Sequence, residues 1–134
     1  MLIPKKLKFQ KTFKGKLKGI TTRGNKIIYG KFALKVLEEA RITHLQLETS
    51  KKILLKKMKK NGTLWVRIFP HIPVTSKPNE NRMGKGKGSV TNWIAKVKKG
   101  QIIFEVTGIS VEFAKKVLNL SSKKLPIKTK FIYK

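Results

Sequence analysis

The chain has 134 residues, the length of one domain, and its 33 lysine and arginine residues against 6 acidic residues give a formal net charge of +27. Self-repulsion at this charge density destabilises a free compact chain, so we expect a polyanionic partner, with nucleic acid ahead of an anionic membrane surface. The absence of cysteine excludes disulfide bonds and cysteine-ligated metal sites, and no apolar run reaches the roughly 20 residues of a membrane-spanning helix.

The first 26 residues are predicted to form a basic N-terminal arm. They contain no acidic residue, and their proline and three glycines argue against a continuous helix. Aromatic side chains such as Phe9 and Phe13 are interleaved with the cations, which is unusual in a purely solvating tail. We therefore expect an arm that becomes ordered on nucleic acid, with a disordered basic tail as the alternative. Its expected RNA contacts are Lys5, Lys6, Lys8, Lys11, Lys14, Lys16, Lys18 and Arg23.

A strand and two helices are predicted next. The β-branched run at residues 26–29 predicts a strand, and the apolar spacing over residues 32–40 predicts a helix. Thr43 followed by Gln46 is a capping-box pattern, which predicts a second helix that ends near Lys60. The lysines that flank the apolar stripe of this second helix leave three interpretations open: a solvated face, an RNA-facing helix or a helix on a membrane surface.

The second half of the chain is predicted to be mainly β. Four strands and one helix are expected there: strands over residues 63–69, 90–97, 101–107 and 127–133, and a helix that Ser110 caps. The prolines after residue 69 predict an extended linker to Pro78, and Lys98 to Gly100 predict a tight turn that makes a hairpin of the two middle strands. This order predicts an α+β fold, with a mixed, largely antiparallel sheet and helices packed on it, in one domain of residues 27–134.

Asn81 to Ser89 form a cationic, glycine-rich stretch within a longer loop of residues 76–89. It superficially resembles a nucleotide-binding P-loop, but Gly88 stands where that motif has lysine, and a β-prone segment follows instead of a helix. Glycines let backbone N–H groups approach phosphate oxygens, while the cations supply charge. The RNA contacts expected here are Lys77, Arg82, Lys85 and Lys87, with the backbone of Gly84, Gly86 and Gly88.

The sequence predicts neither catalysis nor a cofactor. His44 and His71 are isolated and have no cysteine or aspartate partner, so neither is expected to bind a metal or act as a base. Trp65 and Trp93 fall in strand patterns and are expected to pack on the sheet rather than stack on bases. Five of the six acidic residues lie in predicted helices or strands, so the positive field is concentrated in the irregular segments.

Several stretches together resemble the bacterial-type large-subunit ribosomal protein L-sixteen family. They are MLIPKKLKFQKTFKGKLKG, LWVRIFPHIPVTSKP, NRMGKGKGSVTNWIAKVKKGQIIFEVTG and KLPIKTKF, among which RMGKGKG and LPIKT are the most specific. The resemblance implies an α+β domain on large-subunit rRNA, near the base of the central protuberance. It also implies that the arm and the loop reach toward the aminoacyl-tRNA site and the rim of the peptidyl-transferase region.

The resemblance also assigns residues and partners. By motif match, the family's loop corresponds to Arg82, Met83, Gly84, Lys85, Gly86, Lys87 and Gly88, and Lys5, Lys8, Lys11 and Lys14 lie in its arm. The implied partners are large-subunit rRNA, tRNA in the aminoacyl site and neighbouring ribosomal proteins, with no homo-oligomer. Composition alone also allows a free basic protein that binds nucleic acid nonspecifically.

The chain departs from bacterial members in residues 44–60, which are rich in leucine and lysine where those members are rich in alanine and arginine. Lysine replaces arginine almost throughout, which loses bidentate phosphate geometry. The bias toward lysine, isoleucine, asparagine and phenylalanine indicates an AT-rich genome, and residues 72–105 look most like mitochondrially encoded members. The start of the chain lacks the apolar core of a secretory signal. We therefore expect a mitochondrial location, with a plastid or a bacterial cytoplasm as the alternative.

Overall fold

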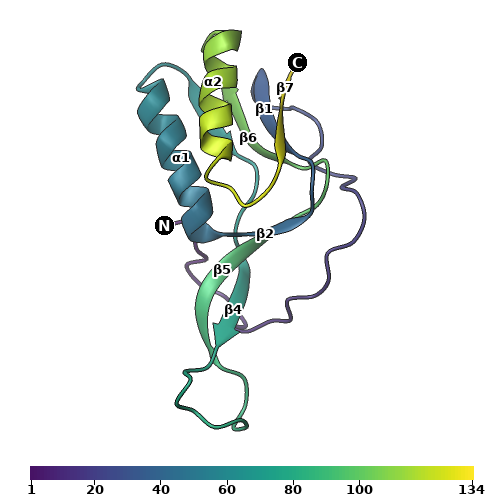
Figure 1. Cartoon of the computed structure of the whole chain (residues 1–134), viewed down its shortest axis with the longest axis vertical. Helices are drawn as coiled ribbons and strands as arrows, with labels where there is room; N and C mark the ends of the chain where they lie inside the picture. Colours follow the sequence, from purple (N-terminus) through teal and green to yellow (C-terminus); the bar gives the residue numbers. More distant parts are fainter.

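Two antiparallel sheets and two helices make up the fold, for which the computed structural model describes all residues 1–134 (Figure 1). The first sheet has the strand order β3-β6-β1-β7, formed by Thr63–Val66, Ile102–Thr107, Phe32–Val36 and Thr129–Tyr133. The second has the order β2-β5-β4, formed by Ala40–Thr43, Ser89–Val97 and Ile72–Ser76. The predicted α+β class with antiparallel pairing is confirmed.

The helices α1 (His44–Met58) and α2 (Val111–Ser122) pack side by side and cover one face of the fold (Figure 1). The predicted capping box is present at the start of α1, because the Gln46 N–H donates to Thr43 Oγ1 at 3.3 Å and the Thr43 N–H donates to Gln46 Oε1 at 3.0 Å. Beneath the helices lies one apolar core, which includes Leu34, Leu54 and Phe104 at full burial. The core fixes the orientation of both sheets.

The other face of the four-stranded sheet is covered by the chain itself. Alternation along β1 turns Ala33 away from Leu34, yet Ala33 is also completely buried. The cover is the segment that leads into β1: the Ile102 N–H donates to the Gly24 carbonyl at 2.9 Å, and the Tyr29 ring stacks on Trp65 at 6.1 Å. Residues 26–29 therefore form this cover and not the strand that their β-branched run predicts.

The helix predicted over residues 32–40 is wrong. This segment contains β1, a turn and the first residue of β2. β1 lies between β6 and β7, and four of its five residues are buried. A strand buried on both faces reads as a continuous apolar run, so its spacing also fits one face of a helix.

The predicted hairpin between residues 90–97 and 101–107 is also wrong. β5 pairs with β2 and β4, whereas β6 pairs with β1 and β3, so the turn at residues 98–100 carries the chain from one sheet to the other. The end of β1 holds this crossing, because the Gly100 N–H donates to the Val36 carbonyl at 2.8 Å and the Val36 N–H donates to Gln101 at 2.8 Å. A short turn with glycine between two β-prone runs favours a hairpin, but here each of the two strands pairs with distant strands instead.

The predicted linker between Pro70 and Pro78 contains a strand, β4. Pro73 lies inside it, which is possible because β4 is an edge strand and needs no N–H donor on its open side. Together β4 and β5 form a ribbon that projects away from the helices and ends in the glycine-rich loop (Figure 1).

Candidate RNA interface

The glycine-rich loop is closed at its base by the last rungs of the β4–β5 ribbon, where Ser76 pairs with Ser89. Gly88 lies against this base. A Cβ atom at Gly88 would stand 2.5 Å from the Ser76 carbonyl oxygen, so only glycine fits there. Gly88 therefore allows the two strands to approach closely below the loop, and we call this close approach of Ser76 and Gly88 the neck.

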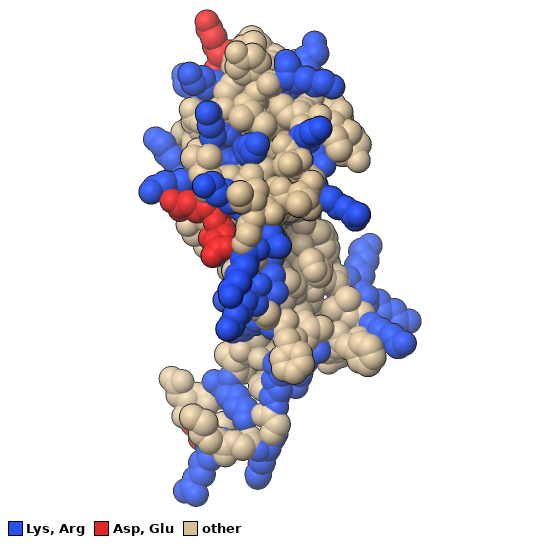
Figure 2. Space-filling view, turned by 90° about the vertical axis from the view of Figure 1, so that its right-hand side faces the viewer, with Lys and Arg blue, Asp and Glu red and all other residues tan.

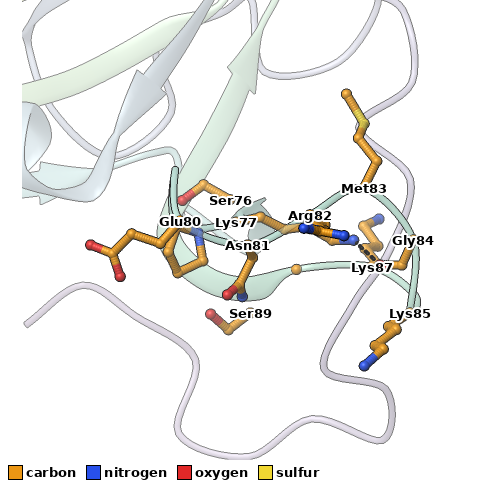
Figure 3. A pocket seen from close by; sticks show the side chains of 12 residues that line it. Ser76, Lys77, Glu80, Asn81, Arg82, Met83, Gly84, Lys85, Lys87 and Ser89 are labelled. Carbon is orange, nitrogen blue, oxygen red and sulfur yellow. Dashed lines mark hydrogen bonds between the residues drawn. The ribbon is translucent and has the colours of Figure 1, made fainter.

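The loop curves around an open hollow of about 630 Å³ (Figure 3). Lys77 Nζ donates to the Gly84 carbonyl across it, and the Asn81 N–H donates to Pro78 at 3.2 Å. Gly84, Lys85 and Gly86 have φ values of +106°, +56° and +87°, so three successive residues adopt the left-handed conformation that two glycines make accessible. Added Cβ atoms at Gly84 and Gly86 would meet nothing within 4 Å, which leaves the backbone at the tip open to a ligand.

The arm, residues 1–26, crosses this loop and is bonded to it. Lys11 Nζ donates to the Lys87 carbonyl at 3.0 Å, and Lys87 Nζ donates to the Thr12 carbonyl at 2.8 Å. We call this reciprocal pair of bonds the arm–loop latch; the arm runs beside the loop as the pale purple ribbon in Figure 3. Lys87 Nζ also lies 5.5 Å from the centre of the Phe13 ring. Two segments more than 70 residues apart thus form one surface.

Beyond the crossing, the arm turns back along the second sheet. Arg41 Nη2 donates to the Gly15 carbonyl at 2.8 Å, and the Thr21 N–H donates to the Lys99 carbonyl at 3.0 Å. Ile20 forms a single parallel bridge with Lys99. The arm therefore follows a defined path along the domain.

Buried Glu105 anchors the segment that follows the arm. Its carboxylate accepts N–H groups from Tyr29 at 2.7 Å and Gly30 at 2.8 Å, and it forms an ion pair with Arg67. The Glu105 side chain has no exposed surface. Burial alone would raise the pKa of Glu105, but the N–H groups of Gly30 and Tyr29, the Arg67 guanidinium and the Ile28 N–H together lower that pKa below its ordinary value.

A second carboxylate, Glu48 on α1, holds the start of the arm. Its Oε1 accepts the Leu2 N–H at 2.5 Å and lies 3.7 Å from the amino group of Met1. The Leu2 N–H lowers the pKa of Glu48, helped by the positive charges of the amino group and Lys52 and opposed by partial burial. Two of the six acidic residues thus serve to fasten the segment that contains the arm.

The structure places the sixteen predicted RNA contacts in two groups. Every lysine and arginine among them is exposed. Lys11 bonds to the loop, and Lys5 and Lys6 border a hollow of about 320 Å³ on the β5 side that Trp93 also lines. Lys16, Lys18 and Arg23 line two hollows farther along the path, and Lys8 and Lys14 are exposed on the arm.

Two basic residues of the second sheet belong to this surface and were missed. Arg41 on β2 stands directly opposite Lys96 on β5, and like charges so paired destabilise a sheet unless an anion lies nearby. Lys96 lines a hollow of about 450 Å³ together with Lys16 and Arg23. Only the strand register brings these residues together, so no local sequence pattern could have identified them.

The aromatic and histidine side chains occupy ordinary positions. Trp65 stacks under Tyr29 on the sheet, as predicted, and Trp93 is half-buried beside the arm. His44 is buried at the start of α1, and exposed His71 contacts the Phe69 carbonyl. No group of three or more histidine or acidic residues is positioned to hold a metal ion, and neither helix has the length and apolarity to cross a membrane.

Basic side chains are spread over the visible face from end to end, with acidic groups in only a few places (Figure 2). An acid-free arm bonded to a cationic loop presents exposed ammonium groups and open backbone on one side of the molecule. Exposed ammonium groups and open backbone N–H groups are the donors that can contact phosphate oxygens.

Comparison with known proteins gives a consistent result along the whole chain. A family model described as "Ribosomal protein L16p/L10e" matches residues 4–132. The "Large ribosomal subunit protein uL16" of Azorhizobium caulinodans is 50% identical over 132 residues, which cover 98% of this chain and 96% of that protein. The corresponding protein of Xanthobacter autotrophicus is 48% identical with the same coverage. "Large ribosomal subunit protein uL16c" of Psilotum nudum is 46% identical over 98% of this chain and 94% of its own.

Proposed function

The chain belongs to the ribosomal protein L16p/L10e family, and from that premise we propose that it binds large-subunit rRNA through its arm and glycine-rich loop. Family membership makes it a structural constituent of the large ribosomal subunit and not an enzyme. In this proposal residues 1–26 are the RNA-binding arm, and residues 27–134 are the domain that carries loop 76–89.

The observation that supports the proposal is the arm–loop latch. Lys11 donates to the Lys87 carbonyl and Lys87 donates to the Thr12 carbonyl, so the two most cationic irregular segments are held together at one place. Neither segment supplies a carboxylate to the latch, and the protein leaves this concentration of charge unneutralised. When a polyanion neutralises this charge, its own counterions are released, and that release favours binding.

The proposed mechanism is electrostatic positioning. Arg82, Lys85 and the exposed arm lysines contact phosphates, while the left-handed backbone at Gly84 and Gly86 lets RNA approach closely. Most of these cations are lysines, which act as point charges rather than bidentate forks. The contacts therefore favour dense phosphate over a particular base sequence.

We further propose that the loop lies near the aminoacyl-tRNA site and the rim of the peptidyl-transferase region, with tRNA as a partner beside rRNA and neighbouring ribosomal proteins. The loop supports this role because it stands at the end of the β4–β5 ribbon, clear of the helices and the core (Figure 1). Arg82→Ala should then impair translation by assembled subunits more than it impairs their assembly. Normal translation by that variant would contradict the tRNA-side placement.

For location we propose the mitochondrion, on the composition and the mitochondrial resemblance of residues 72–105. A plastid or a bacterial cytoplasm remains the alternative, and the bacterial and plastid relatives are compatible with it. Immunoblotting of purified organelles and cytoplasm from the source cells tests this location. The proposal requires the protein in the mitochondrial fraction, and recovery in another fraction would contradict it.

RNA binding is tested most simply by salt dependence. Arg82→Gln with Lys85→Gln should reduce the slope of log affinity against log salt by about 2 on large-subunit rRNA, since each lost phosphate contact removes about one unit. Lys115→Gln with Lys116→Gln, which removes two exposed charges from α2, is the matched control and should change the slope less. Equal changes would mean loose binding to any polyanion, as expected of a free nonspecific nucleic-acid-binding protein.

A further inference from the structure

Phe13 is the most exposed aromatic side chain of the protein, with 94% of its surface accessible. It lies on the arm beside the arm–loop latch, with Lys87 Nζ 5.5 Å from its ring centre. Leaving a phenylalanine in water forgoes the free energy that its burial would supply. A single exposed apolar side chain is ordinary in itself, so what distinguishes this ring is where the backbone and a cation hold it.

The backbone is held by hydrogen bonds on both sides of Phe13. Thr12, the preceding residue, accepts a hydrogen bond from Lys87 through its carbonyl, and Arg41 holds the Gly15 carbonyl two residues after the ring. Both bonds are 2.8 Å long. Holding the chain on both sides before a ligand arrives lowers the entropy cost of binding at Phe13.

The chemistry around the ring favours a nucleobase. A lysine ammonium within about 6 Å of an aromatic ring is attracted by its π-electrons, which leaves the rest of the ring available for stacking. Phe13 is flanked in sequence by Thr12 and Lys14, and Lys11 lies one residue further back, so the neighbourhood attracts phosphate. A base can then stack on the ring while its own phosphates meet the lysines.

The same neighbourhood disfavours an apolar protein surface as the partner. A hot spot between proteins needs a contiguous apolar centre that excludes water. Phe13 has only polar or charged residues and a glycine within two positions on either side. A base inside a duplex is equally unsuitable, because its faces are already stacked on its neighbours.

We propose that Phe13, backed by Lys87, is a stacking site for an unpaired RNA base. This inference rests on the proposed RNA-binding function and goes beyond it, because it assigns a contact with a base where that function needs only phosphates. Phe9 provides an internal comparison: it is 68% exposed, and the cation 5.7 Å from its ring centre is its sequence neighbour Lys8 rather than a residue of the loop.

The test compares Phe13→Leu, Phe13→Trp and Phe9→Leu with the unchanged full chain, using a short oligouridylate and an RNA duplex of equal charge. Phe13→Leu keeps an apolar side chain but removes the π-face, so it should weaken oligouridylate binding about fivefold or more, as loss of one stacked base does. Duplex binding should not change. Phe13→Trp should retain affinity, and its added fluorescence should be quenched by oligouridylate and not by the duplex.

The possible outcomes distinguish failure of the stacking site from failure of the proposed RNA-binding function. If the unchanged chain fails to bind large-subunit rRNA, the proposed function itself fails. If it binds and Phe13→Leu has no effect, weakens both probes equally, or matches Phe9→Leu, the stacking site is overturned. A photo-crosslinking benzoylphenylalanine at position 13 in assembled large subunits should attach to RNA, and attachment to a ribosomal protein or to nothing would also overturn it.

Discussion

The protein holds its N-terminal segment in two contrasting ways. At Ile28 to Gly30 the chain is fixed by a buried carboxylate, Glu105, which gathers three backbone N–H groups and the Arg67 guanidinium. At the arm–loop latch the chain is held by two exposed lysines that donate to carbonyl oxygens. Acidic groups are used where the segment must stay attached, and cations alone are used where a polyanion is expected.

The difference also predicts where stability and binding reside. A buried carboxylate with several charge-assisted bonds contributes strongly to folding, because removing it leaves its partners unsatisfied in a dry environment. Exposed lysine–carbonyl bonds contribute little to folding because water competes for both groups. The first region should therefore control the fold, and the second should control RNA binding with little effect on the fold.

The largest effect is expected from Glu105→Gln. This variant leaves Arg67 without its charged partner and should lower the free energy of unfolding by about 3 to 5 kcal/mol, as found when one member of a buried ion pair is removed. Chemical denaturation of the free protein measures the loss. Glu112→Gln, at an exposed position in the first turn of α2, is the control and should cost less than about 1 kcal/mol. Similar losses would show that Glu105 has no special role.

A smaller loss should follow Gly88→Ala. The added Cβ would stand 2.5 Å from the Ser76 carbonyl, so the neck of the β4–β5 ribbon must open, at a cost of about 1 to 3 kcal/mol. RNA affinity should fall with it because the loop moves. Gly24→Ala is the comparison: nothing lies within 4 Å of its added Cβ, although its φ of +74° adds a backbone strain that Gly88 does not have. If both variants bind RNA equally well, the shape of the neck does not matter for binding.

Acid should release both carboxylate anchors. The folded-state pKa values of Glu105 and Glu48 lie below the ordinary 4.5, so their stabilisation is complete above about pH 4.5 and is lost as the pH falls through the lowered values. Hydrogen exchange of the amides of Leu2 and Tyr29, compared with those of the α1 interior, should show this. The latch has no carboxylate, so equal acid sensitivity at Lys87 would contradict the contrast between the two regions.

The smallest effect on stability is expected from Lys87→Gln. Lys87 is exposed, so the free energy of unfolding should change by no more than about 0.5 kcal/mol. RNA affinity should fall nevertheless, because the variant loses both a charge and the bond to Thr12 that fixes the arm. Lys115→Gln removes an equal charge on α2 without touching the arm. A large loss of stability in Lys87→Gln would show that the latch contributes to folding, which contradicts the contrast between the two regions.

Local signals in the sequence predicted the elements that local interactions form. The Thr43–Gln46 capping box located the start of α1, because a helix cap lies within a few residues. Ser110 does stand at the N-cap position of α2, but its side chain makes no capping hydrogen bond. β1 was mistaken for a helix because its burial comes from two neighbouring strands, and the supposed hairpin failed because β5 and β6 join different sheets.

The candidate site was predictable as a set of cations and not as a surface. The sequence predicted Lys11 and Lys87 as RNA contacts, but their 76-residue separation concealed the latch. The like-charge pair of Arg41 and Lys96 depends on strand register. The role of Glu105 depends on Arg67, which lies 38 residues away in sequence. These features arise from the fold, so they need the structure.

The central claim is that the protein itself holds the arm against the loop before RNA binds. Because the chain has no cysteine, Gln10→Cys with Asn81→Cys provides one unique pair for spin labels on the arm and the loop. Their distance distribution, measured for the free protein and for assembled large subunits, should be single and narrow in both states. A broad distribution in the free protein that narrows only in the subunit would contradict the claim.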